Sequence, residues 1–268
     1  MTDTPVAAPL IELDRATVIR GDTHALDDLS LRIELGQHTA LLGANGCGKS
    51  TFIKLINREL YPLAREGEAP VRLMGQARWR TQTLRAQLGV VTSDLTADLQ
   101  SMPSLTVEDA VVTGFFASFA LPIDEDVTAA QRARARQTLD QVGALALAER
   151  QVGALSTGQM RRVLIARAMV HGPKALLLDE PTAGLDLIAQ RDFTVLMSQL
   201  ARDGITLVLV THHIEEIVPE IDRIVLLREG QVLADGTRAA VLTDDLLSQA
   251  YGGALKVRYD NGRYFASS

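Results

Sequence analysis

The stretch Gly43-Ala44-Asn45-Gly46-Cys47-Gly48-Lys49-Ser50-Thr51 matches the pattern G-x-x-x-x-G-K-[S/T] of a phosphate-binding loop. It follows an apolar run at 39–42 that is expected to form a buried strand. It precedes residues 52–56, which are expected to form a helix. This order of strand, loop and helix is the context in which the pattern binds phosphate. The sequence therefore predicts an anion-binding loop at 43–51.

The residue types in this loop explain the prediction. Glycines allow the backbone to approach phosphate oxygens closely, and the first N–H groups of the following helix are unpaired donors that point at an anion. Lys49 adds a positive charge, which at about 4 Å and an effective dielectric of about 20 attracts a unit charge by roughly 4 kcal/mol. Ser50 offers a hydroxyl to a magnesium ion. A glycine-rich turn without a ligand is the alternative, and it is disfavoured because strand, loop and helix are in register.

Composition and charge narrow the class of protein. The chain has 268 residues, 47% of them hydrophobic, which is enough for one large domain or two small ones. The net charge of −6 argues against nucleic acid as a partner. A single cysteine forms no internal disulfide, as suits a reducing cytosol. The N-terminal residues do not form the pattern of a signal peptide, and no apolar run approaches membrane-spanning length.

Short apolar strands alternate with helical stretches along most of the chain. Strands are expected at 10–13, 25–35, 88–92, 175–178 and 205–210, and a hairpin at 224–234. The residues from 99 to 167 have a helical pattern, with no strand punctuation over 107–119. Alternation of this kind predicts an α/β fold with a mostly parallel sheet that is covered by helices on both faces. Because no repeat is present, we expect one catalytic core with a helical insertion.

An acidic pair ends one of the expected strands. Asp179 and Glu180 follow the apolar run 175–178, which places two carboxylates at the carboxyl edge of the sheet, where ligands bind in open α/β folds. Asp179 is suited to hold magnesium directly or through water, and Glu180 is suited to accept a proton from an attacking water. A simple helix start is the alternative for such a pair.

Two further runs carry candidate polar groups. Ser156 is positioned to cap the helix that follows it, in the run Ser156-Thr157-Gly158-Gln159, and the donors at that helix start would attract a phosphate. An ordinary capped helix is the alternative. His212 and His213 follow the apolar run 205–210. A histidine there is either a satisfied polar residue or, beside a phosphate site, a partner of the terminal phosphate or the attacking water.

Together these runs resemble the ATP-binding-cassette (ABC) ATPases over residues 10–236, in the family's order and spacing. The resemblance implies a P-loop NTPase core with an N-terminal antiparallel β subdomain and an inserted α-helical subdomain. It implies roles for named residues. Lys49, Glu180 and His212 are implied to be catalytic, as the Walker A lysine, the catalytic glutamate and the switch histidine. Asp179, Ser50 and Ser93 are implied to hold Mg²⁺. The residues implied to contact ATP are Gly43, Asn45, Gly46, Cys47, Gly48, Lys49, Ser50, Thr51, Arg20, Ser156, Gly158, Gln159 and Asp186.

The same resemblance implies an assembly. Family members form head-to-tail homodimers in which ATP lies between the Walker A loop of one subunit and the signature residues 156–159 of the other. We expect one nucleotide-binding domain, with core and β subdomain at about 8–98 and 168–268 and the helical subdomain at about 99–167. The run 105–116 is similar to single-cassette bacterial importers near the metal-chelate and molybdate group. A membrane-spanning permease is the expected partner, and through it the chain would lie on the inner, cytoplasmic face of the cell membrane.

Three positions depart from the family pattern. A glutamine that usually follows the strand 88–92 is replaced by Ser93, which is too short to bridge the same gap to magnesium and the membrane partner. Thr157 stands where glycine is usual, and its branched side chain narrows backbone freedom. Arg20 stands where an aromatic residue usually stacks on adenine. A guanidinium plane can also stack on a ring, although a solvated loop arginine is an equal alternative.

Two groups of residues have open interpretations. Cys47 lies two residues before Lys49, and positive charge with helix-start donors would favour its thiolate, so that alkylation would block ATP hydrolysis. An inert small side chain is the alternative. A group of arginines in the helical region is expected to be solvated surface, with a membrane partner or anionic lipid as the alternative contact; these are Arg132, Arg134, Arg136, Arg161 and Arg162.

The sequence thus predicts an ATPase that drives transport as a subunit of a membrane complex. One alternative is a soluble ABC-type ATPase that acts as a mechanical switch on another protein, which the missing glutamine at Ser93 favours. Another is a nucleotide-sensing module without useful hydrolysis, which the joint presence of Asp179, Glu180 and His212 disfavours. The transported substrate is not encoded in a cassette of this family.

Overall fold

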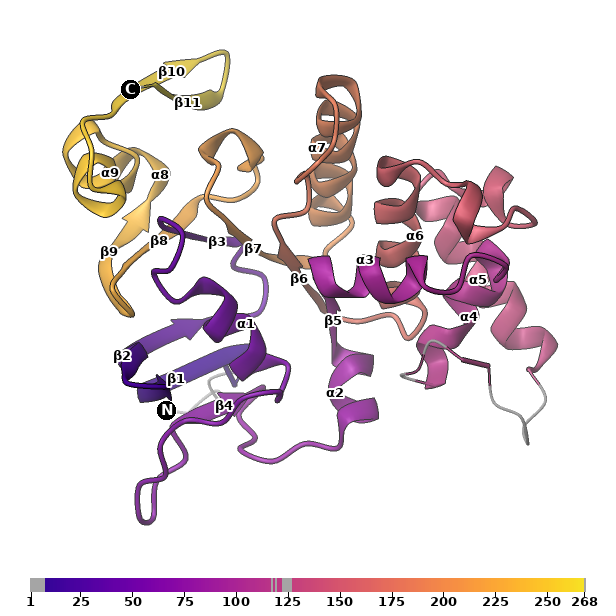
Figure 1. Ribbon diagram of the computed structural model, residues 1–268, viewed down its shortest axis with the longest axis horizontal. Coiled ribbons are helices and arrows are strands. Elements are labelled where there is room, and N and C mark those ends of the chain that lie inside the picture. Colours follow the sequence, from indigo (N-terminus) through magenta and orange to yellow (C-terminus); the bar gives the residue numbers. More distant parts are fainter. Residues whose placement is uncertain (1–7, 117, 119, 122–126, 268) are drawn as a thin grey trace, which may run out of the picture. The chain divides into compact units, whose positions relative to one another are not determined.

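A computed structural model describes residues 8–116, 118, 120–121 and 127–267 (Figure 1). The chain divides into two compact units. The first contains Met1–Trp79 and Val210–Ser268, and the second contains Arg80–Leu209. The division falls within strand β7 (Thr206–Thr211), so the chain passes from the second unit back to the first inside one strand.

An antiparallel sheet is built from the N-terminal part of the first unit. Strands β1 (Ile11–Arg20), β2 (Thr23–Ile33) and β4 (Val71–Leu73) pair in the order β2-β1-β4. Strand β1 is longer than the expected 10–13 because a bulge shifts its register against β2 after Leu13. Arg15 lies in the bulge with φ of 46°. A bulge breaks the alternation of inward and outward side chains, which hid the continuation of the strand from the sequence pattern.

The phosphate loop joins a buried strand to a helix, as predicted. Strand β3 (Thr39–Leu42) is buried at every residue and pairs in parallel with β8 (Arg223–Arg228). Helix α1 (Lys49–Ile56) starts directly after the loop. Strand β9 (Gln231–Thr237) pairs antiparallel with β8, which confirms the expected hairpin.

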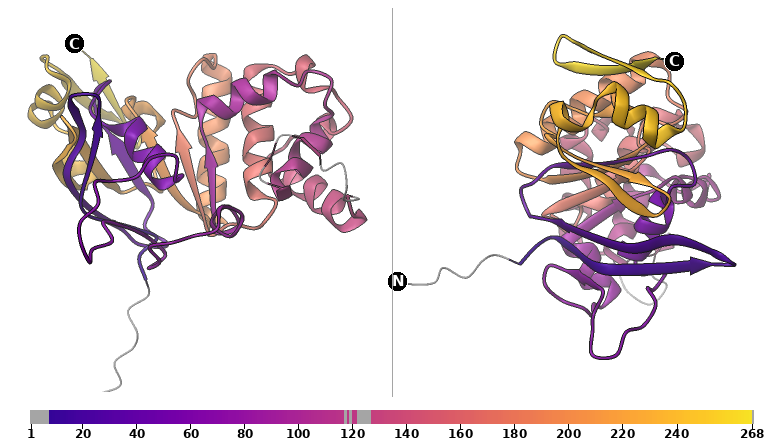
Figure 2. Two further views of the ribbon diagram at one scale, coloured as in Figure 1. Left: turned by 60° about the horizontal axis from the view of Figure 1, so that its bottom comes forward. Right: turned by 90° about the vertical axis from the view of Figure 1, so that its left-hand side faces the viewer.

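The first unit ends in helices and a hairpin. A short turn of 3-10 helix, η4 (Ile214–Glu216), follows β7. Helices α8 (Arg238–Val241) and α9 (Asp244–Tyr251) follow β9. Strands β10 (Lys256–Asp260) and β11 (Arg263–Ser267) then form an antiparallel pair. Figure 2 shows this hairpin, in yellow, beyond the helices that precede it.

The second unit combines buried strands with helices. Strand β5 (Leu88–Val91) pairs in parallel with β6 (Ala175–Asp179), and β7 follows β6 in the strand order. Both the parallel pairing and the buried strands agree with the predicted α/β fold. The helical elements of this unit are α2 (Thr81–Gln87), α3 (Ser93–Gln100), α4 (Val107–Val112), η1 (Thr113–Phe116), α5 (Ala129–Gln141), η2 (Leu145–Leu147), η3 (Val152–Ala154), α6 (Thr157–Met169) and α7 (Leu187–Arg202).

The expectation of solvated surface holds for Arg136, which is exposed, and was wrong for Arg161, which is buried. The other three arginines are half-buried and join helices to one another. Arg132 on α5 donates to Glu108 and Asp109 of α4, each at 3.0 Å. Arg134 donates to the backbone carbonyl of Val170 at 3.0 Å, just beyond α6. Arg162 on α6 donates to the carbonyl of Val142 at 2.6 Å, just beyond α5. Helices α4, α5 and α6 pack on each other, and these side chains tie their polar edges together.

Candidate functional site

Close packing accounts for two glycines of the phosphate loop. A Cβ at Gly43 would lie 2.5 Å from the Cys47 Sγ and from the Leu227 carbonyl oxygen of β8. At Gly48, φ is 112° and a Cβ would lie 2.6 Å from the Ala25 carbonyl oxygen. Side chains at these positions would push the loop away from its neighbouring strands. The start of the loop is therefore held against β8, and its end is held against β2.

Lys49 is buried beneath the loop, with 7% of its surface exposed. Its Nζ donates to the carbonyl oxygens of Gly43 at 2.6 Å and Ala44 at 3.0 Å. A lysine ammonium has three donors, so the loop accounts for two of them. Because its position is fixed by its own loop, the positive charge is preorganised for an anion.

The start of α1 has the features of an anion site. Its N-cap residue is Gly48, and no side chain caps it. The first N–H groups of the helix thus have no side-chain acceptor, which is the arrangement that favours a bound anion. Asn45 and Gly46 are exposed at the apex of the loop, and Ser50 is exposed on the first turn, whereas Thr51 is buried.

Cys47 differs from its expected chemistry. The side chain is 6% exposed. Burial raises the pKa of the Cys47 thiol above its usual value, and the smaller opposing effect of Lys49 does not reverse the direction. The expected thiolate was wrong, because desolvation of the sulfur outweighs the nearby positive charge. The alternative of an inert small side chain fits the structure.

Alkylation of Cys47 in the folded protein is therefore expected to be slow. Since the thiolate is the reactive form, iodoacetamide at mildly alkaline pH should label the native chain at least about ten times more slowly than the unfolded chain. Mass spectrometry of timed samples measures both rates, with the guanidinium-unfolded chain as the control. Equal rates in the two states would contradict the buried, protonated thiol.

His212 follows the last residue of β7 and is half-buried, while His213 is exposed. The two imidazole rings lie with centroids 3.9 Å apart. The Thr211 hydroxyl oxygen accepts from the backbone N–H of His213 at 3.0 Å, which turns the chain directly after the strand. The Tyr251 phenol donates to the His212 carbonyl at 2.8 Å. These two hydrogen bonds thus hold the backbone at His212, the histidine predicted to be catalytic.

Arg20 ends strand β1 and is exposed. Within the described residues, no hydrogen bond or ion pair involves its side chain. It lies at a strand end, directly before the turn at Gly21, and its exposure also fits the alternative of a solvated arginine. Its guanidinium is free to meet a ligand, and stacking on adenine stays a prediction.

In the second unit, the acidic pair lies where the sequence placed it. Asp179 is the last residue of β6, and Glu180 follows with φ of 42°. Residues other than glycine rarely adopt this left-handed conformation, and such strain concentrates at functional sites. The Ala183 N–H donates to the Glu180 carbonyl at 3.0 Å, closing the turn that leads toward α7. The pair therefore stands at a sharp exit from a buried strand.

The predicted cap at Ser156 is confirmed. Its hydroxyl oxygen accepts from the Gln159 backbone N–H at 3.3 Å, and the Gln159 Oε1 accepts from the Ser156 N–H at 3.0 Å. This capping box occupies both side chains. A Cβ at Gly158 would lie 3.4 Å from the Ala189 Cβ of α7. The start of α6 therefore packs on the start of α7.

Asp186 is the N-cap of α7. Its Oδ1 accepts from the Ala189 N–H at 2.8 Å. Gly158 packs on that same Ala189, so the signature residues and Asp186 share one neighbourhood within the second unit. Ser93 is the first residue of α3 and is exposed, with Thr92 as the N-cap. A short serine at a helix start replaces the longer side chain that the family pattern has there.

The donor types fit a nucleotide with magnesium. The hydroxyl of Ser50 and the carboxylate of Asp179 are the hard oxygen ligands that Mg²⁺ prefers, and this ion is usually held by one or two carboxylates together with substrate phosphates. Among the described residues, no group of three or more His, Cys, Asp and Glu side chains could hold a metal on its own.

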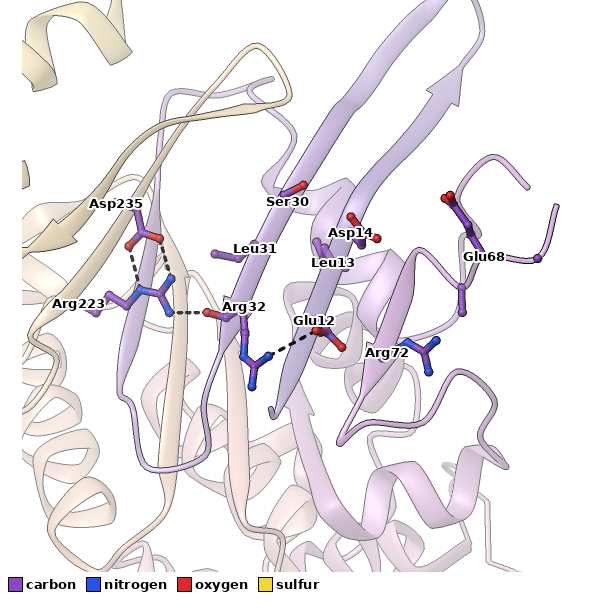
Figure 3. Close-up of a pocket in the computed structure, with 12 residues that line it drawn as sticks. Glu12, Leu13, Asp14, Ser30, Leu31, Arg32, Glu68, Arg72, Arg223 and Asp235 are labelled. Atoms are coloured by element: carbon purple, nitrogen blue, oxygen red, sulfur yellow. Dashed lines mark hydrogen bonds and ion pairs between the residues drawn. The ribbon is translucent and has the colours of Figure 1, made fainter. Parts of the chain in front are cut away.

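A charged groove in the first unit is lined by residues of β1, β2, β4, β8 and β9 (Figure 3). Its volume is about 630 Å³. Arg223 makes two hydrogen bonds to the Asp235 carboxylate there, at 2.8 and 2.6 Å. Arg32 faces Glu12 at 3.7 Å. Two arginines of the groove thus each face a carboxylate of the same groove.

Sequence reasoning did not find Tyr251, which contacts the carbonyl of His212. No local pattern marks this tyrosine, since the two residues are 39 positions apart.

Among the described residues, no helix has the length and apolar character needed to cross a membrane.

Comparison with known proteins identifies the family to which this sequence and fold are similar. The family model described as ABC transporter matches residues 26–183. The cobalt import ATP-binding protein CbiO of Rhodobacter capsulatus is 39% identical over 84% of this chain and 77% of its own length. Two solved structures have the same fold. CbiO1 from Clostridium perfringens, part of the ABC transporter complex cbiONQ, is 30% identical with a TM-score of 0.72 over 90% of this chain and 94% of its own. The ATP-binding cassette MJ0796, dimeric in a post-hydrolysis state with ADP and Pi, is 26% identical with a TM-score of 0.68 over 85% and 98%.

Proposed function

This chain belongs to the ABC transporter family of ATP-binding cassettes, and on that premise we propose how its own residues bind and hydrolyse ATP for transport. The observation that carries the proposal is the loop 43–51, with Lys49 buried and held by two of its own carbonyls. Membership in the family makes the chain an ATPase subunit of a transporter. The roles of individual residues, the metal and the assembly are proposals.

The phosphate groups bind at the start of α1. The uncapped N–H groups of the helix and the loop amides donate to the phosphate oxygens, and the third donor of Lys49 is directed at the β and γ phosphates. Ser50 and Asp179 would hold Mg²⁺, and when bound the ion would supply positive charge that offsets the charge of the phosphates. Binding is thus mostly a matter of positioned donors, as in other phosphoryl-transfer sites.

Hydrolysis needs a water that is oriented in line with the γ-phosphate. Glu180 orients this water and accepts its proton, and His212 donates to the γ-phosphate. The strained backbone of Glu180 supports this role, because a left-handed glutamate is kept in place only by surrounding structure. These residues supply geometry and electrostatics and form no covalent intermediate.

A second copy of the chain completes the nucleotide-binding site. The start of α6, with Ser156, Gly158 and Gln159, meets the ATP that is bound by the partner's loop, and Asp186 lies beside it. The solved dimer of MJ0796 with ADP and Pi supports a homodimer. Such an interface is isologous, because each copy contributes the same two surfaces.

Transport requires a membrane-spanning permease, and the chain acts from the inner face of the membrane through that partner. Relatives named as import ATP-binding proteins support transport over the alternative of a switch on another protein. They also support import, although the metal-chelate and molybdate branch stays a prediction. Ser93 at the start of α3 is shorter than the glutamine of the family pattern and would hold the ion less directly, so other residues of this segment would contribute to coupling with the permease.

We expect a permease to copurify with the chain. An affinity-tagged copy expressed in its own cells and extracted in mild detergent should retain a polytopic membrane protein, identified by mass spectrometry. A soluble switch would instead retain a soluble protein. A Glu180→Gln copy with Mg-ATP serves as a second sample, since a trapped dimer should keep its partner. Recovery of the chain without any membrane protein in either sample would contradict the transport role.

A further inference from the structure

Tyr251 contacts both predicted site segments of the first unit. It is the last residue of α9, and its phenol donates to the His212 carbonyl at 2.8 Å. The backbone of Gly43 lies close enough to the same phenol to lower its pKa, against the larger effect of burial. One side chain therefore joins the first residue of the phosphate loop to the residue that follows β7.

The contacts continue to the loop lysine. The Lys49 Nζ donates to the Gly43 carbonyl at 2.6 Å, and Gly43 lies beside the phenol that donates to His212, so Lys49 and His212 belong to one connected neighbourhood. Burial raises the pKa of the Tyr251 phenol well above its usual range, and nearby Cys47 and Glu215 raise it further. The phenol is therefore protonated at neutral pH and able to donate to His212.

Two hydrogen bonds hold the peptide that joins His212 and His213. The Thr211 hydroxyl holds the N–H of His213 on one side of the peptide that joins the two histidines. Tyr251 holds the carbonyl of that same peptide from the other side. Because the direction of a side chain follows from its backbone, fixing this peptide plane fixes where the His212 imidazole can point.

Tyr251 belongs to the C-terminal segment, defined here as residues 244–267, and hydrogen bonds within this segment join α9 to the residues that follow it. The Ser248 hydroxyl oxygen accepts from the Leu255 N–H at 2.8 Å, and the Asp244 carboxylate accepts from the Val257 N–H at 2.7 Å. The hairpin then returns to the histidine segment, where the Ala266 N–H donates to Glu215 at 3.2 Å. The C-terminal segment thus contacts the chain at both Glu215 and His212.

We propose that Tyr251 is a positioning residue for ATP hydrolysis, which holds His212 in register with the phosphate loop through the His212 carbonyl. The inference rests on the proposed role of His212. It gives the C-terminal segment a function, because α9 and the hairpin carry the phenol to this carbonyl. Tyr251 contacts no phosphate itself, so its removal should affect turnover and leave nucleotide binding nearly unchanged.

The test replaces only the phenol hydroxyl. Loss of one hydrogen bond to a positioned group predicts that Tyr251→Phe lowers kcat for Mg-ATP hydrolysis about fivefold. KM and the Kd of a fluorescent ATP analogue should stay within about twofold of wild type. In a His212→Ala background, the same change should lower kcat by less than about twofold, because the group that it positions is absent. Hydrogen exchange of the peptide that spans His212 should rise in Tyr251→Phe.

Tyr259→Phe is the matched control. Tyr259 is on β10 of the same segment, is 61% exposed, and makes no hydrogen bond through its hydroxyl within the described residues. It should hydrolyse ATP at the wild-type rate. Wild-type kcat in Tyr251→Phe, or an equal loss in the His212→Ala background, would overturn the inference alone. Wild-type kcat in His212→Ala would overturn the proposed role of His212, and the inference with it.

Discussion

Glu180→Gln is expected to bind ATP normally and to hydrolyse it about a hundred to several thousand times more slowly, the range that loss of a positioned general base produces. Glutamine keeps the shape of the side chain and its capacity for hydrogen bonds, but it cannot accept the proton of the attacking water. Nucleotide binding depends on the loop 43–51 and on Lys49, which the substitution does not change. With Mg-ATP the variant should accumulate as a dimer, because the step that reopens it is blocked.

Steady-state phosphate release measures turnover in this variant, and size-exclusion chromatography with Mg-ATP measures the dimer. Glu229→Gln is the matched control, since Glu229 is also a glutamate with positive φ, at 51°, and its side chain is 80% exposed. It undergoes the same chemical change at the same kind of backbone position, so it reports any effect of strain. Turnover of Glu180→Gln within a few-fold of the control would overturn the assignment of Glu180.

Local patterns were readable in the sequence wherever one segment carries the whole signal. The loop before α1, the acidic pair after β6 and the cap at Ser156 each depend on residues that are close in the chain. Their physical causes are short-range: a glycine turn, a strand that ends at a sheet edge, and a side chain that reaches a helix start. For that reason their positions in the structure agree with the prediction.

The sequence was misleading where a distant contact or burial decides the result. Cys47 has a charge nearby in the sequence, but its desolvation comes from packing that the local pattern does not contain. Arg132 and Arg136 on α5 look like surface charge, yet both meet Glu108, which lies more than twenty residues earlier in the chain. Tyr251 reaches His212 only because α9 folds back onto the end of β7. These contacts depend on tertiary structure, which residue spacing does not specify.

Lys49→Ala is expected to weaken ATP binding about a hundredfold. The gross attraction of an ammonium for one phosphate charge is roughly 4 kcal/mol at an effective dielectric of about 20, and solvent and magnesium screen about a third of it. Each 1.4 kcal/mol corresponds to about a factor of ten in Kd, so the remaining attraction accounts for about two orders of magnitude. The variant also frees the carbonyls of Gly43 and Ala44, which loosens the loop.

Lys54→Ala is the control, because Lys54 lies on the same helix and makes no side-chain hydrogen bond or ion pair within the described residues. Fluorescence titration with an ATP analogue should give wild-type affinity for Lys54→Ala and weak binding for Lys49→Ala. Thermal melts without nucleotide show whether Lys49→Ala still folds. A cooperative transition at a somewhat lower melting temperature indicates a folded protein with a loosened loop, and weak binding by such a protein is then a loss of affinity. If a folded Lys49→Ala protein bound ATP as tightly as Lys54→Ala, the loop would not be the phosphate site, and the roles built on it would fail together.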